Sequence, residues 1–88
     1  MPTISMFFGI LISMFTGTRE HRPPHIRADY GEFSASFDIL TAGRIEGSLP
    51  PRQSRMVMAW IQIHSEELLA NWTLVERRGV LFKIDPLK

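Results

Sequence analysis

The feature that most constrains the fold of this chain is a long segment, residues 51–77, with apolar residues at helical spacing. Pro50-Pro51 precedes it, and proline suits the first turn of a helix. Arg77-Arg78-Gly79 follows it, and basic residues with a glycine are typical of a helix end. We therefore predict one long helix from Pro51 to about Arg77. The apolar stripe along this helix is too wide for a single surface to cover. It consists of Val57, Trp60, Ile61, His64, Leu68, Trp72 and Val75, and it is widened by Met56, Ile63 and Leu74.

The residues before the helix alternate with the two-residue period of β-strands. The clearest alternation lies in residues 33–40, where Phe33, Ala35, Phe37 and Ile39 are separated by polar residues. Residues 3–15 are predicted to form one strand with Met6, Phe8 and Ile10 on its apolar face, and Gly9 marks a bulge or bend.

Shorter strands complete the expected sheet. Residues 25–30 are predicted as a strand, residues 44–47 as an edge strand, and residues 80–87 as a last strand or an extended tail. The fold class expected is therefore α+β: an antiparallel meander of four to five strands, with one long helix of the C-terminal half packed across it.

Length, composition and charge limit the classes of function. The 88 residues form a single small domain, 1–88. The absence of cysteine excludes disulfides and thiol chemistry, and a net charge of +1 gives no overall attraction to nucleic acid. The apolar run at residues 6–15 is too short to span a bilayer, and no basic side chain precedes it as in a signal peptide. We expect a cytoplasmic protein without membrane contact.

A basic loop around Pro23-Pro24 offers the first candidate site. Prolines stiffen it, because they fix the backbone and remove donors. Three interpretations remain open: histidines bonded to the loop's own backbone, a metal site at His21 and His25, or an anion or nucleic-acid contact. Like charge from Arg27 disfavours a cation beside His25. We therefore predict no metal and no cofactor, and assign anion binding to Arg19, Arg22, His25 and Arg27.

A second candidate lies on the helix. His64, Glu67 and Asn71 are spaced to share one side and could face the His21–His25 loop as a polar site. The simpler interpretation is a core histidine at position 64 bonded to a backbone group. The chemical alternative makes His21, His25 and His64 the catalytic candidates of a small hydrolase or nuclease. No serine or cysteine nucleophile stands in a recognisable motif, and no glycine-rich phosphate loop is present.

Several short motifs together resemble a known family. They are Met1-Pro2-Thr3-Ile4, Phe8-Gly9-Ile10, the His21–His25 stretch, Tyr30-Gly31-Glu32, Gly47-Ser48-Leu49-Pro50 and the stretch from Trp60 through Glu67-Leu68 to Asn71-Trp72. Their combination resembles the short bacterial proteins described as a domain of unknown function, DUF4160. The family's loop has an acidic residue, His, one further residue and Pro-Pro-His-Phe-His. Here Arg27 replaces the last histidine and Ile26 the phenylalanine, so a histidine metal site would lack one ligand.

The resemblance also implies a kind of function. Members of that family resemble, in size and gene neighbourhood, components of two-gene modules of the toxin–antitoxin kind. We therefore expect an interaction protein that acts by binding a partner protein, with nucleic acid as a further partner. A homo-oligomer or a tight partner complex is also expected, because the chain carries more apolar surface than one sheet and one helix can hide: Met6, Phe8, Ile10, Trp60, Ile63 and Trp72.

Overall fold

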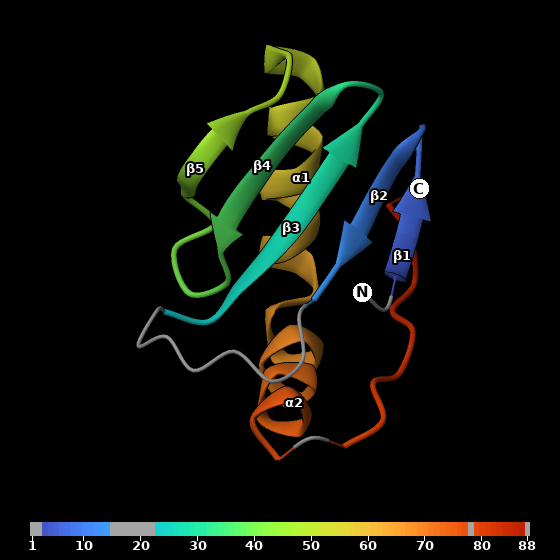
Figure 1. The fold of residues 1–88 in the computed structure, drawn as a ribbon, viewed down its shortest axis with the longest axis vertical. Helices are drawn as coiled ribbons and strands as arrows, with labels where there is room; N and C mark the ends of the chain where they lie inside the picture. Colours follow the sequence, from blue (N-terminus) through green and yellow to red (C-terminus); the bar gives the residue numbers. More distant parts are fainter. Residues whose placement is uncertain (1–2, 15–22, 78, 88) are drawn as a thin grey trace.

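The computed structural model describes residues 3–14, 23–77 and 79–87, and it has the expected α+β architecture (Figure 1). Five antiparallel strands form one sheet in the order β1-β2-β3-β4-β5. The strands are β1 (Thr3–Phe7), β2 (Ile10–Ser13), β3 (His25–Tyr30), β4 (Phe33–Asp38) and β5 (Arg44–Ser48), and the helices are α1 (Pro51–Ile63) and α2 (Ser65–Glu76). None of the helices in these ranges is both long and apolar enough to cross a membrane.

The first segment is a hairpin rather than the single strand predicted from its alternation. Phe7 pairs with Ile10, and the two residues between them both have positive φ, 48° at Phe8 and 78° at Gly9. Two positive φ values in a two-residue loop match the twist of the flanking strands. The turn shifts the alternation by one position, so Phe7 is buried while Met6 and Phe8 are exposed. The prediction of one strand with Met6 and Phe8 on the same face as Ile10 is wrong.

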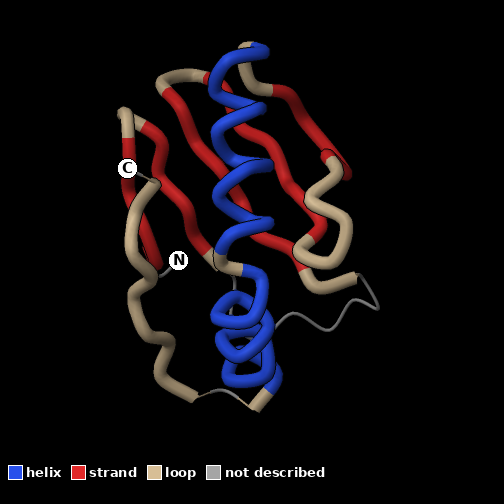
Figure 2. Tube along the Cα trace, turned by 180° about the vertical axis from the view of Figure 1, so that it is seen from behind, coloured by secondary structure: helices blue, strands red, loops and turns tan. Residues whose placement is uncertain are grey.

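The predicted single helix is two helices with a break at His64. The backbone of His64 has φ −110° and ψ 22°, and Ser65 begins α2. Backbone hydrogen bonds continue on both sides of the break, because His64 N–H donates to Trp60 C=O and Leu68 N–H donates to His64 C=O. Glu66 and Glu67 lie in the first turn of α2, where negative charge favours a helix start. Figure 2 shows α1 crossing one face of the sheet and α2 continuing beyond the end of the strands.

The core lies between α1 and the sheet face that it covers. Its largest fully buried side chain is Trp60, and Phe37 is next. Alternate residues of the strands supply the rest, whereas the opposite face of the sheet is largely polar. The principal apolar members are Ile4, Ile10, Ile12, Met14, Ile26, Phe37, Ile39, Val57, Trp60, Ile61 and Leu68. Ile10 and Trp60 are therefore buried within the protein and leave no apolar surface for a partner to cover. This corrects part of the argument for oligomerisation.

The C-terminal segment, residues 79–87, covers a flank of the helices that the sheet does not reach. It is an extended tail without strand pairing, one of the two outcomes predicted for it. It runs beside β1 and in the same direction (Figure 1). Ile84 N–H donates to Ile4 C=O, and Trp60 Nε1–H donates to Asp85 C=O. The wide apolar stripe of the helical region is thus covered partly by the chain's own end.

Gly47 provides a test of the sheet. Its φ is +74°, and an added Cβ would collide with the carbonyl oxygen of Ser34 on the neighbouring strand. We expect Gly47→Ala to lower the free energy of unfolding by roughly 2 to 4 kcal/mol, because the clash involves backbone atoms. Gly31→Ala is the control: its φ is +55° with nothing within 4 Å of the added Cβ. That variant should lose only about 1 kcal/mol in urea denaturation. Equal losses would contradict this account of β5.

Candidate functional site

The basic loop is represented in the structure by its last part. Arg19, His21 and Arg22 lie outside the described residues. His25 begins β3 with 7% of its surface exposed, and its Nδ1 is 2.9 Å from the carbonyl oxygen of Pro23. A carbonyl only accepts, so Nδ1 carries the proton and donates. The ring also packs against Trp72 of α2, with ring centroids 5.1 Å apart. His25 therefore has a backbone partner and an aromatic neighbour, as in the structural interpretation of this loop.

Arg27 also has a partner within the protein. Its Nε lies 3.1 Å from Oδ1 of Asp29, two residues along the same strand, and both side chains are partly exposed. In the sheet, Arg27 pairs with Ser13 on one side and Ser36 on the other, on the face opposite α1. The neighbouring carboxylate offsets much of its attraction for an anion. The two described members of the predicted anion site, His25 and Arg27, are thus each engaged in contacts within β3 or next to it.

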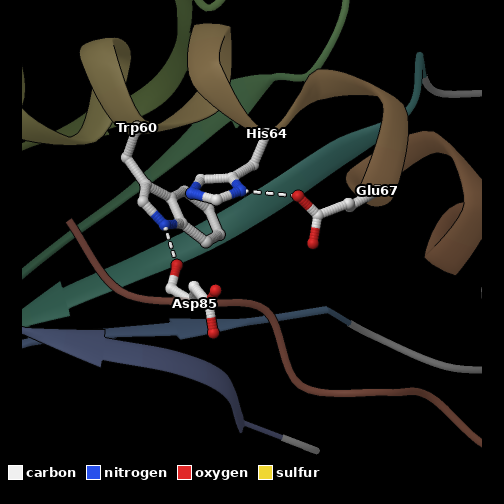
Figure 3. Close-up of polar contacts among 4 residues, drawn as sticks. All are labelled: Trp60, His64, Glu67 and Asp85. Atoms are coloured by element: carbon white, nitrogen blue, oxygen red, sulfur yellow. Dashed lines mark hydrogen bonds and ion pairs between the residues drawn. The ribbon is translucent and has the colours of Figure 1, made fainter.

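The predicted polar trio on the helix is divided between two places. His64 Nδ1 lies 2.7 Å from Glu67 Oε1, and the His64 ring packs on Trp60 with centroids 5.5 Å apart (Figure 3). Asn71 is fully buried and bonds to the C-terminal segment instead: its Nδ2 donates to Phe82 C=O at 2.8 Å, and its Oδ1 accepts from Phe82 N–H at 3.1 Å. Asn71 therefore holds the tail, and His64 with Glu67 forms a separate pair at the helix junction.

The pair of His64 and Glu67 has the geometry of a base and the group that orients it. A carboxylate that accepts from Nδ1–H leaves Nε2 as the basic nitrogen. The His64 side chain is only 14% exposed, and its recorded neighbours are the Trp60 ring and the Glu67 carboxylate. The contact with Trp60 accounts for the packing of the His64 ring, and the contact with Glu67 accounts for its orientation. Within the described ranges, no three His, Cys, Asp or Glu side chains gather into a group that could hold a metal ion.

A different feature emerges between the first hairpin and the tail. A groove of about 440 Å³ is lined by residues of both, beside β1 at the edge of the sheet. Its volume falls in the range of ligand-binding clefts. The strands supply one wall with Thr3, Ile4, Ser5, Met6 and Leu11, and the tail supplies the other with Lys83, Ile84, Asp85 and Pro86.

Exposed apolar side chains lie along the hairpin side of this groove. Met6 and Leu11 line the groove as cross-strand partners, 63% and 42% exposed, and Phe8, 61% exposed, lies in the adjoining turn outside the groove lining. We call these three residues the hairpin patch. The groove was not predicted from the sequence, because residues 3–15 were expected to form one strand with Met6 and Phe8 on the same face as Ile10. The one available signal was Gly9 in the middle of an apolar run, which fits a two-residue turn as well as a bulge.

Comparison with known proteins adds a family. The family described as a domain of unknown function (DUF4160) matches residues 9–73, which is most of the chain. The match includes β2, β3, β4, β5 and α1 and ends within α2. No curated protein and no solved structure matches the chain.

The tail wall of the groove depends on Asn71, which gives a stability test. We expect Asn71→Ala to cost about 2 to 3 kcal/mol, because two buried hydrogen bonds to Phe82 are lost. Thr73→Ala is the control, since its hydroxyl donates to Leu69 C=O on an exposed helix surface; its cost should stay below about 0.5 kcal/mol. Urea denaturation measures both values, and amide exchange at Phe82 should accelerate only in Asn71→Ala. Equal stability losses and equal amide exchange at Phe82 in the two variants would refute the role of Asn71 in holding the tail.

Variants of His64 test whether this residue has a structural role or a catalytic one. We expect His64→Ala to cost roughly 1 to 3 kcal/mol, because it removes a ring from Trp60 and a partner from Glu67. Any measured activity should then fall only with the folded fraction, and His64→Gln should retain it. The measurement is a denaturation curve beside a growth-inhibition assay. A fully folded His64→Gln protein without activity would place His64 in the chemistry instead.

Proposed function

The chain belongs to the DUF4160 family, and we propose that it is a protein-interaction module whose partner binds the hairpin patch. The observation that carries this proposal is the clustering of Met6, Phe8 and Leu11 on one hairpin, beside a groove. Single exposed apolar residues are normal on a protein surface, but adjacent ones beside a concavity mark interaction sites. The other exposed large apolar residues of the described ranges are spread over several elements: Phe33 on β4, Leu40 in the turn after β4, Ile45 on β5, Ile63 at the end of α1, and Val80 and Phe82 in the tail.

The proposed partner is a second small protein of a two-gene, toxin–antitoxin-like module. The family resemblance supports this choice, and so does the residue composition of the hairpin patch. Aromatic residues and methionine are enriched at the centres of such interfaces, and the patch contributes both. A homo-oligomer through the same patch is the competing arrangement. Nucleic acid would be a further ligand, and the basic residues Arg19, Arg22, His25 and Arg27 are its predicted contacts.

A test of this function uses two exposed residues and a matched control. The protein is co-expressed with the product of the neighbouring gene, and the affinity of the purified complex is measured by calorimetry. We expect Met6→Ser with Phe8→Ser to weaken the complex at least tenfold, since each lost anchor at an interface costs about 1 kcal/mol or more. Leu40→Ser is the control, because Leu40 is 66% exposed but lies in the turn after β4.

The outcomes of this test are distinct. Equal affinity for the double variant and the control would refute the patch as the binding surface. A parent protein that forms no complex, and that remains monomeric by light scattering at high concentration, would refute the function itself. Growth arrest on expression of one gene, relieved by the other, would support the two-gene module.

A histidine-dependent hydrolase or nuclease is the second candidate function. The contact of 2.7 Å between His64 Nδ1 and Glu67 Oε1 favours it, because it orients the imidazole as a general base requires. The fold-retaining variant His64→Gln separates it from the interaction module: a hydrolase would lose turnover, whereas an interaction module would keep its partner.

A further inference from the structure

The groove lies at the β1 edge of the sheet, which the tail covers only in part, and its backbone groups matter as much as its side chains. β1 pairs with β2 on one side only. Phe7 and Ile10 flank the two-residue turn, so they are a hydrogen-bonded pair, and the next pair, Met6 with Leu11, is of the non-bonded kind. The N–H and C=O of Met6 therefore point away from β2, towards the edge where the groove opens.

The tail covers this edge incompletely. Ile84 N–H reaches Ile4 C=O, which is the one backbone hydrogen bond recorded between the tail and β1 in the described part of the chain. The next carbonyl, of Asp85, is already bonded to the Trp60 indole. Pro86 follows, and proline has no N–H to donate. Pairing with β1 thus stops below Met6, and the tail turns its polar groups towards α1.

We propose that the groove binds an extended segment of the partner protein, which adds to the sheet as a strand beside Met6. This inference rests on the proposed function and specifies how the partner engages. Main-chain hydrogen bonds to the Met6 N–H and C=O would supply affinity, and an apolar side chain against Met6 and Leu11 would supply specificity. The volume of about 440 Å³ accommodates a few residues rather than a folded domain.

A second copy of this chain fits the site less well. The three side chains of the hairpin patch fall short of the roughly 800 Å² per partner that a stable interface buries. Pairing of β1 with β5 of a second copy would be head-to-tail and would not close into a dimer, and antiparallel pairing of two β1 strands would close but would rest on the same three side chains and one strand edge. An extended segment needs no such surface, because it supplies its own backbone donors and acceptors.

The residues that line the groove indicate which kind of partner segment would fit it. Lys83 and Asp85 place both signs of charge on the tail side, while Met6 and Leu11 face it across the groove. A strand presents alternate side chains to opposite sides. We therefore expect a segment in which apolar residues alternate with polar ones of either charge.

The experiment uses the full chain and a phage-displayed library of random decapeptides. Selected peptides should alternate in polarity, and a saturating selected peptide should slow amide exchange at Met6 at least tenfold, measured by NMR. Exchange at Phe7, whose amide already pairs with Ile10, should change far less. Met6→Pro removes the outward N–H from an edge strand and should weaken peptide binding at least tenfold, and more than Met6→Ala does. Leu40→Ser should bind as the parent does.

Each result decides the proposal, including the case in which Met6→Pro fails to fold, since amide exchange in the parent protein remains decisive. Failure to select any peptide that protects Met6 would overturn strand addition. If the neighbouring gene product still binds through Met6 and Phe8, the interaction function stands and only its mode is wrong. If peptides protect Met6 but no protein partner binds, the groove is confirmed and the two-gene assignment falls.

Discussion

The burial of Trp60 is the interaction on which the rest of the structure depends. Its ring has no exposed surface, packs on Phe7 with centroids 5.4 Å apart, and donates its N–H to Asp85 C=O at 2.8 Å. One side chain thus joins the helix, the first hairpin and the tail. An indole N–H buried without an acceptor costs about 1 to 3 kcal/mol. The core therefore stabilises the docked tail, and the docked tail completes the core.

The sheet has two edges, and the chain protects them differently. At β5 the pairing with β4 is interrupted between Ser36 and Phe37, and Gly47 has positive φ, so the strand is short and irregular. Such irregular edges discourage pairing with other chains. At β1 the tail covers the edge, but the tail's contacts with Trp60 and Asn71 direct it towards the helices. The groove exists because the contacts that position the tail are mainly with the helices and not with the sheet edge.

The sequence predicted those parts of the fold that rest on local patterns. β3, β4 and β5 fall within two residues of their expected bounds, because their alternation has no competing interpretation. The hairpin at Phe8-Gly9 was missed because the run around it is apolar on nearly every residue, which hides the shift of one position. The break at His64 was missed because neither glycine nor proline marks it. Trp60 to Asp85 and Asn71 to Phe82 are side-chain contacts to backbone across 25 and 11 residues, and such contacts leave no periodic signal.

The helix junction is linked to the groove through the contacts that the two helices make with the tail. Trp60 lies on α1 and Asn71 on α2, and each holds a different part of the tail. The break at His64 sets the angle between the two helices, and the contact of His64 with Glu67 spans that break. A change in this angle would displace the tail and with it one wall of the groove. The two helices thus jointly position the segment that faces β1, through Trp60 on α1 and Asn71 on α2.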